Sequence, residues 1–171
     1  MENHKVVWGI IGCGDVTEKK SGPALNLVAN SQLMAVMRRD AAKAADYAER
    51  HHVPLWYSQA EDLLDNIDIN AIYIATPPSS HLAYALSALR KGKHVYVEKP
   101  VTLNAQEAES LLEEVKARGG KLVVAHYRRA LPLFLKVKEL IDQRAIGELR
   151  TVQLRLWQSR TPDLVTKDAG D

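Results

Sequence analysis

The chain has 171 residues, of which 46% are hydrophobic and 26% charged, and its formal net charge at pH 7 is +2. This is enough apolar material for a real core, and a charge so near neutral gives no reason to expect nucleic acid or a membrane surface as a partner. The single cysteine, Cys13, excludes a fold that is stapled by internal disulfides.

The sequence carries no signal for a membrane or for export. No apolar run is long enough for a transmembrane helix. Residues 1–5 lead into a short apolar run without a small-residue cleavage site, so we expect no signal peptide. With one cysteine and no such signals, we expect a cytoplasmic location.

Short β-rich runs alternate with helical stretches along the first 126 residues. The run at 6–11 is continuously apolar, which indicates a strand buried on both faces. Further strands are predicted at 33–37, 55–57, 71–75, 94–97 and 122–125. Helices are predicted at about 16–28, 40–51, 79–91 and 104–119, with a brief one around 63–64. Six such units predict an α/β fold with a doubly wound parallel Rossmann sheet in the order 3-2-1-4-5-6.

The last part of the chain breaks this rhythm. A helix is predicted at 131–144, and residues 149–158 then alternate between apolar and polar side chains, as in a strand of an antiparallel sheet. We therefore expect a Rossmann domain at 1–126, and at 127–171 a connecting helix and the first strand of a truncated α+β domain. An unpaired strand edge also predicts self-association into a homo-oligomer.

A glycine turn follows the first predicted strand, with Gly9, Gly12 and Gly14 in the spacing of a dinucleotide-binding fingerprint. The third small residue of that fingerprint is replaced by Thr17, which predicts looser packing between helix and strand. The alternative is an ordinary turn between a strand and a helix. The residues predicted to bind the pyrophosphate are Gly12, Cys13, Gly14, Asp15 and Val16.

The end of the second predicted strand indicates which dinucleotide binds. NAD-binding domains place an acidic residue there for the ribose 2′-hydroxyl, whereas this chain has Arg38 and Arg39. Two guanidinium groups suit a 2′-phosphate, and Asp40 is better placed as a helix cap. We therefore predict NADP in preference to NAD; the alternative is that both arginines are solvated loop residues.

Three motifs together resemble the Gfo/Idh/MocA oxidoreductases, the relatives of glucose–fructose oxidoreductase and inositol dehydrogenase. They are Gly-Ile-Ile-Gly-Cys-Gly at 9–14, Ile-Ala-Thr-Pro-Pro-Ser-Ser-His at 74–81 and Val-Glu-Lys-Pro at 97–100. The resemblance extends over residues 6–158 in the same order and spacing, and the Glu-Lys-Pro motif is its most specific part.

The resemblance implies roles for particular residues. Lys99 would be catalytic, approaching the substrate hydroxyl and the nicotinamide, and Glu98 would hold the nicotinamide side of the cofactor. Arg128 would reach the cofactor or the substrate, although Tyr127 stands where the family usually has asparagine. Without the resemblance, Glu98 and Lys99 form a surface pair. Other predicted cofactor contacts are Thr76, Pro77 and His81.

These residues predict the NAD(P)-binding portion of an oxidoreductase. It would transfer hydride between a nicotinamide cofactor and the hydroxyl or carbonyl group of a sugar- or polyol-like compound, with no metal. Because the second domain of the family encloses the substrate, we expect no efficient turnover by this chain alone. The alternatives are a non-catalytic dinucleotide-binding or regulatory module, and an assembly protein that pairs through the strand at 149–158.

Overall fold

The structure, a computed structural model, describes residues 5–157. The chain forms two units that meet at the peptide bond between His126 and Tyr127. The first unit contains a parallel sheet with helices on both faces, and the second contains two helical segments.

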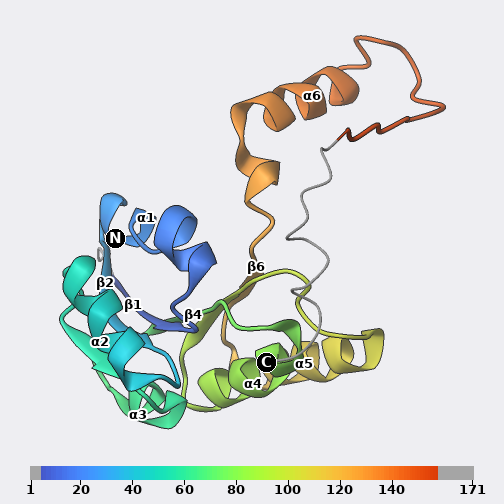
Figure 1. Ribbon diagram of the computed structural model, residues 1–171. Helices are drawn as coiled ribbons and strands as arrows, with labels where there is room; N and C mark the ends of the chain where they lie inside the picture. Colours follow the sequence, from blue (N-terminus) through green and yellow to red (C-terminus); the bar gives the residue numbers. More distant parts are fainter. Residues whose placement is uncertain (1–4, 158–171) are drawn as a thin grey trace. The chain divides into compact units, whose positions relative to one another are not determined.

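The first unit is built on a six-stranded parallel sheet in the order β3-β2-β1-β4-β5-β6 (Figure 1). This confirms the predicted doubly wound topology, in which successive connections run outward in both directions from β1 and β4. The strands are β1 (Val6–Ile11), β2 (Ser31–Met37), β3 (Leu55–Tyr57), β4 (Ala71–Ile74), β5 (His94–Val97) and β6 (Leu122–Val124).

Helices cover the two faces of this sheet. One buried cluster joins the sheet to α3 (Ala60–Asp65), α4 (His81–Arg90) and α5 (Ala105–Arg118). A second cluster, on the opposite face, includes side chains of α2 (Ala41–Arg50) and of α1 (Ala24–Leu27). Neighbouring strand residues alternate between the two clusters, because successive side chains of a strand point to opposite faces. Ile72 and Ile74 of β4 therefore belong to the first cluster and Tyr73 to the second.

Local sequence signals set the ends of several helices. Asp40 caps α2, with its carboxylate accepting a hydrogen bond from the Lys43 N–H at 3.2 Å. The predicted helix at 16–28 is interrupted, as expected from Pro23: a π-helical turn, η1 (Thr17–Ser21), precedes the short α1. The remaining short element of this unit is the 3-10 turn η2 (Pro78–Ser80).

The second unit contains the 3-10 turn η3 (Tyr127–Ala130) and the helix α6 (Pro132–Asp142), near the predicted position of a helix. The predicted strand at 149–158 is not formed: residues 149–157 have no regular secondary structure, and Gln158 lies outside the described residues. The physical reason is that a strand is held by ladder hydrogen bonds to a neighbour, and the alternating pattern alone supplies none.

Candidate functional site

The carboxyl ends of four neighbouring strands form one edge of the sheet. Ile11 is in register with Met37 of β2 and Ile74 of β4, and Ile74 is in register with Val97 of β5. The residues that follow these strands therefore begin side by side. Because β1 and β4 are neighbours whose connections leave in opposite directions, this edge is a topological switch point, the usual ligand site of open α/β sheets.

The glycine turn lies at the centre of this edge. Gly12 has a φ of +93°, and its N–H donates to the Met37 carbonyl at 2.9 Å. A Cβ on Gly12 would lie 2.7 Å from Cγ2 of Thr76 and 3.0 Å from the backbone of Ala75, whereas a Cβ on Gly14 would meet nothing within 4 Å. Gly12 is thus needed for the turn itself, and Gly14 leaves open space beside it.

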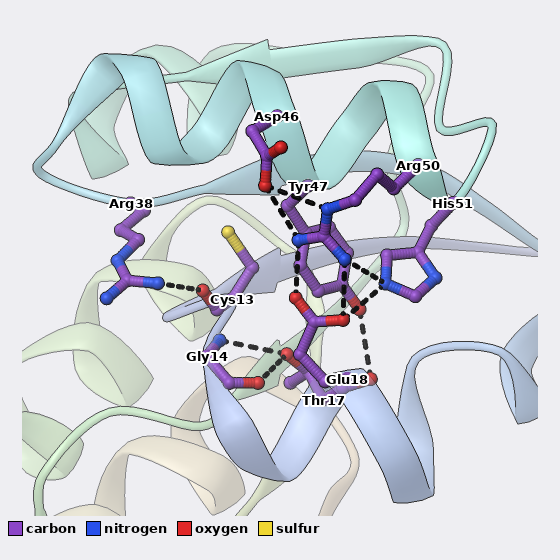
Figure 2. Close-up of polar contacts among 9 residues, drawn as sticks. All are labelled: Cys13, Gly14, Thr17, Glu18, Arg38, Asp46, Tyr47, Arg50 and His51. Atoms are coloured by element: carbon purple, nitrogen blue, oxygen red, sulfur yellow. Dashed lines mark hydrogen bonds and ion pairs between the residues drawn. The ribbon is translucent and has the colours of Figure 1, made fainter.

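Thr17 closes the turn, and the prediction of looser packing at this residue is wrong. Its side chain is fully buried, and its Oγ1 accepts from the Gly14 N–H at 2.9 Å and donates to the Gly14 carbonyl at 2.8 Å. The Thr17 carbonyl in turn accepts from the Tyr47 hydroxyl at 3.0 Å (Figure 2). The Thr17 hydroxyl ties the turn to itself with two hydrogen bonds that a glycine or alanine there would lack, and the Thr17 backbone carbonyl ties the turn to α2.

An ion-pair cluster joins η1 to the end of α2 (Figure 2). Nη1 and Nη2 of Arg50 both donate to the Glu18 carboxylate, at 3.0 and 2.7 Å, and His51 Nε2 lies 2.7 Å from Glu18 Oε2. The Arg50 hydrogen bonds and the nearby His51 hold the pKa of Glu18 at about 2, well below its usual value. Arg50 Nε also donates to a second carboxylate, at Asp46 Oδ2, over 2.8 Å. None of these side chains stood out in the sequence, because Glu18 is 28 residues or more from the other three along it.

The two arginines that follow β2 differ in their exposure to solvent. Arg38 is partly buried and its Nη1 donates to the Cys13 carbonyl at 3.2 Å, which brings the guanidinium to the glycine turn (Figure 2). Arg39 is exposed. Asp40 is engaged as the cap of α2 and also pairs with Lys43 at 3.3 Å. The acidic side chain nearest to this strand end is therefore already used within the helix.

Cys13, Asp15 and Val16 contribute to the turn in different ways. The Cys13 side chain is 1% exposed, and burial raises the pKa of its thiol to about 11. At neutral pH this thiol is therefore protonated and packs as a small apolar group, as a buried cysteine usually does. Asp15 and Val16 are both exposed at the start of the following helical turn.

His81 connects the two loops that follow β4 and β5. Its side chain is fully buried, with Nδ1 2.8 Å from the Pro100 carbonyl oxygen and Nε2 2.7 Å from the Thr76 carbonyl oxygen. Both ring nitrogens thus face backbone groups of the protein, and the ring has no surface to offer a ligand. Thr76 is partly buried and lies next to Gly12, and Pro77, the residue that follows it, is exposed.

Glu98 and Lys99 follow β5 at the same edge of the sheet. The Glu98 N–H donates to the Ile74 carbonyl at 2.9 Å, and its partly buried side chain accepts from the Tyr73 hydroxyl at 2.7 Å. Lys99 is exposed. Tyr73 was not predicted as a site residue; a hydroxyl inside an otherwise apolar strand was the signal, because a buried phenol needs a hydrogen-bond partner.

The remaining predicted residue, Arg128, lies in η3 and belongs to the second unit. Among residues 5–157, no His, Cys, Asp and Glu side chains gather in a group of three or more that could hold a metal ion. In the same part of the chain, no helix has both the length and the hydrophobicity needed to cross a bilayer.

Comparison with known proteins identifies relatives with the same sheet. Residues 6–126 match the model of the Gfo/Idh/MocA oxidoreductase family, described as having an NAD-binding Rossmann fold. Oxidoreductase P35 of Formosa agariphila is 53% identical over 163 residues, which are 95% of this chain and 51% of that protein. The chain spans about half the length of the curated relatives it matches.

Solved structures give the same result. Scyllo-inositol dehydrogenase from Lactobacillus casei, with bound NAD(H) and scyllo-inositol, superposes with a TM-score of 0.78 at 26% identity, covering 84% of this chain and 43% of that one. The 3-ketoreductase KijD10 from Actinomadura kijaniata, in complex with NADP and TDP-benzene, gives 0.79 at 30% identity, covering 85% and 44%. The chain therefore belongs to the Gfo/Idh/MocA oxidoreductases and carries their NAD-binding Rossmann fold at residues 6–126.

Proposed function

We propose that this chain is the cofactor-binding part of an NADP-preferring oxidoreductase that acts on a sugar- or polyol-like hydroxyl or carbonyl group. The observation that carries the proposal is the order of groups along one sheet edge: Arg38 after β2, the glycine turn after β1, and Glu98 with Lys99 after β5. A dinucleotide that lies across the switch point meets these groups in that order, from its adenosine half to its nicotinamide.

The adenosine end is assigned to Arg38 and Arg39. A 2′-phosphate takes charge-assisted hydrogen bonds from guanidinium groups, and Arg38 already lies at the turn, 3.2 Å from the Cys13 carbonyl. The engagement of Asp40 as a helix cap supports the preference, since a ribose 2′-hydroxyl lacks its usual carboxylate partner there.

The pyrophosphate is assigned to the backbone of residues 12–16. The open space beside Gly14 lets phosphate oxygens approach the chain without meeting a Cβ. Thr17 and Tyr47 support this role by fixing the turn before any ligand arrives. Thr76 and Pro77 line the neighbouring part of the edge, and His81 holds their loop against the Glu-Lys-Pro loop.

The nicotinamide end is assigned to Glu98 and Lys99. The bound nicotinamide ring supplies the chemistry of hydride donation and acceptance. Lys99, exposed at the end of β5, holds or releases the proton at the substrate oxygen, while Glu98 orients the cofactor. Arg128 is assigned a contact with cofactor or substrate. The polyol substrate class is supported by the relative that binds scyllo-inositol, and action on a carbonyl group is supported by the relative that is a 3-ketoreductase.

The Arg38→Ala variant tests the cofactor assignment. The variant is expected to lose affinity for NADPH by about tenfold or more, because one charge-assisted hydrogen bond to the 2′-phosphate is removed. Its affinity for NADH should change little, since NADH has no such phosphate. Titration of the purified chain, followed by cofactor fluorescence, measures both constants.

Asp142→Ala provides a matched control, because this exposed carboxylate belongs to the second unit and pairs with Lys138. It should leave both affinities unchanged. Equal losses for NADPH and NADH in Arg38→Ala would contradict a contact with the 2′-phosphate. A wild-type chain that binds neither cofactor would contradict the proposed function itself.

We also propose a cytoplasmic location. A further proposal is self-association through residues 149–157, which become a strand when a second copy supplies the hydrogen-bond partners of a sheet. Val152, Leu154 and Leu156 are 71, 94 and 83% exposed, and they alternate with polar residues as one face of such a strand would. Light scattering behind size-exclusion chromatography should give a mass above that of the monomer. Replacing Leu154 and Leu156 by serine should return it to the monomer; a wild-type monomer contradicts the proposal.

A further inference from the structure

A line of hydrogen bonds runs from η1 to the Glu-Lys-Pro loop through a buried tyrosine. Ser21 Oγ donates to the Tyr73 hydroxyl at 2.9 Å, and that hydroxyl donates to Glu98 Oε1 at 2.7 Å. The three residues come from three segments: the end of η1, the middle of β4 and the residue after β5. Ser21 and Glu98, which are 77 residues apart in the sequence, are thus joined through the phenol of Tyr73.

The Tyr73 side chain is unusual for its place. It is fully buried, and the other residues of β4 are Ala71, Ile72 and Ile74. The centroid of its ring lies 5.1 Å from the centroid of the Tyr96 ring. A phenylalanine would fill the same space without a polar atom, so the hydroxyl contributes hydrogen bonds rather than volume. Burial raises the pKa of Tyr73, which keeps the phenol protonated and able to donate.

The Glu98 carboxylate is held on one side only. Oε1 accepts from Tyr73, the backbone N–H donates to the Ile74 carbonyl at 2.9 Å, and the side chain is partly buried. Within residues 5–157, Oε2 has no hydrogen-bond partner in the structure. One carboxylate oxygen is thus held by a buried donor, and a carboxylate held in this way is preorganised to accept a hydrogen bond at its other oxygen.

We infer that Tyr73 is a positioning residue: its hydroxyl fixes Glu98 so that the second carboxylate oxygen meets the nicotinamide end of the cofactor, and Ser21 orients the phenol. The inference rests on the proposed function, which assigns Glu98 to that end. It adds a physical link between the segment that follows the pyrophosphate turn and the segment that holds the nicotinamide, since Ser21 closes η1.

Two ligands that differ only in the nicotinamide test the inference. The Tyr73→Phe variant is expected to bind NADPH about fivefold to tenfold more weakly, as for one lost hydrogen bond to a charged group. Its affinity for 2′-phospho-ADP-ribose, which is NADPH without the nicotinamide, should not change. If NADH proves to be the cofactor of the wild-type chain, NADH and ADP-ribose replace this pair. Tyr96→Phe is the matched control, because it removes a tyrosine hydroxyl from the same face of the sheet.

A double-mutant cycle with Glu98→Ala separates positioning from general packing. If Tyr73 acts through Glu98, Tyr73→Phe has no further effect on NADPH binding once Glu98 is alanine. An equal loss for both ligands, or an undiminished effect of Tyr73→Phe in the Glu98→Ala background, overturns the inference while leaving cofactor binding intact. Unchanged NADPH binding in Tyr73→Phe also overturns it. A wild-type chain that binds no cofactor overturns the proposed function, and this inference with it.

Discussion

Replacing Gly12 by alanine is expected to destabilise the chain by about 3 kcal/mol. Two costs add at this position. The φ of +93° is unfavourable for any residue with a Cβ, and the new Cβ would lie 2.7 Å from Thr76 Cγ2 and 3.0 Å from the backbone of Ala75. Because backbone cannot move aside as a flexible side chain does, the turn itself must shift. Thermal unfolding followed by circular dichroism measures the loss, as a fall in Tm of roughly 10 °C.

Gly14→Ala is the matched control for this substitution. A Cβ there would meet nothing within 4 Å, and the backbone is not in the left-handed region, so the Tm should stay close to that of the wild type. Its affinity for NADPH should fall, since the added methyl enters the space assigned to the pyrophosphate. If Gly12→Ala melts at the wild-type temperature, or if both variants are destabilised equally, the role given to Gly12 is wrong.

Glu18→Gln is expected to destabilise the folded chain by about 2 kcal/mol at pH 7. The pKa of Glu18 falls from its usual 4.5 to about 2, chiefly through the hydrogen bonds from Arg50. Full conversion of that shift would give about 3.4 kcal/mol. The side chains of Glu18 and Arg50 are 27% and 47% exposed, so water weakens the pair and the smaller figure is expected.

The same pair makes a prediction about pH. Because the pKa of Glu18 is lower in the folded chain than in the unfolded chain, its stabilisation is complete above about pH 4.5 and is lost as the pH falls through about 2. Urea unfolding at several pH values should therefore show the wild type and Glu18→Gln converging between those limits. Asp46→Asn, which alters a carboxylate that is 62% exposed on the same Arg50, should cost less than about 1 kcal/mol. A wild-type advantage that persists unchanged to pH 2 contradicts this account.

The sheet could be predicted from local pattern because each strand is a short apolar run bounded by turn residues. Six such runs, separated by helical stretches, allow few topologies other than the doubly wound one, since crossovers between parallel strands are right-handed. A strand needs a neighbour to complete its ladder of hydrogen bonds, and each strand of the sheet has one. The predicted strand at 149–158 was not formed because residues 149–157 have no such neighbour in the described chain. The sequence pattern identified the side chains that suit a strand, but not the partner.

The residues of the candidate site also fall into two groups: those that the sequence pattern could place, and those whose roles depend on packing. Motif spacing placed the glycine turn, Arg38 and the Glu-Lys pair at the ends of strands, because parallel strands bring their carboxyl ends to one edge. Spacing could not assign Thr17 to closing the turn, His81 to bracing two loops, or Tyr73 to holding Glu98. These roles depend on which buried donor meets which acceptor across the sheet, and only packing decides that. By itself the sequence therefore determined the sheet and the order of residue types along its edge. The tertiary structure decided which of these side chains are exposed and which hold the others in place, since a buried polar group must find its partner wherever the fold puts one.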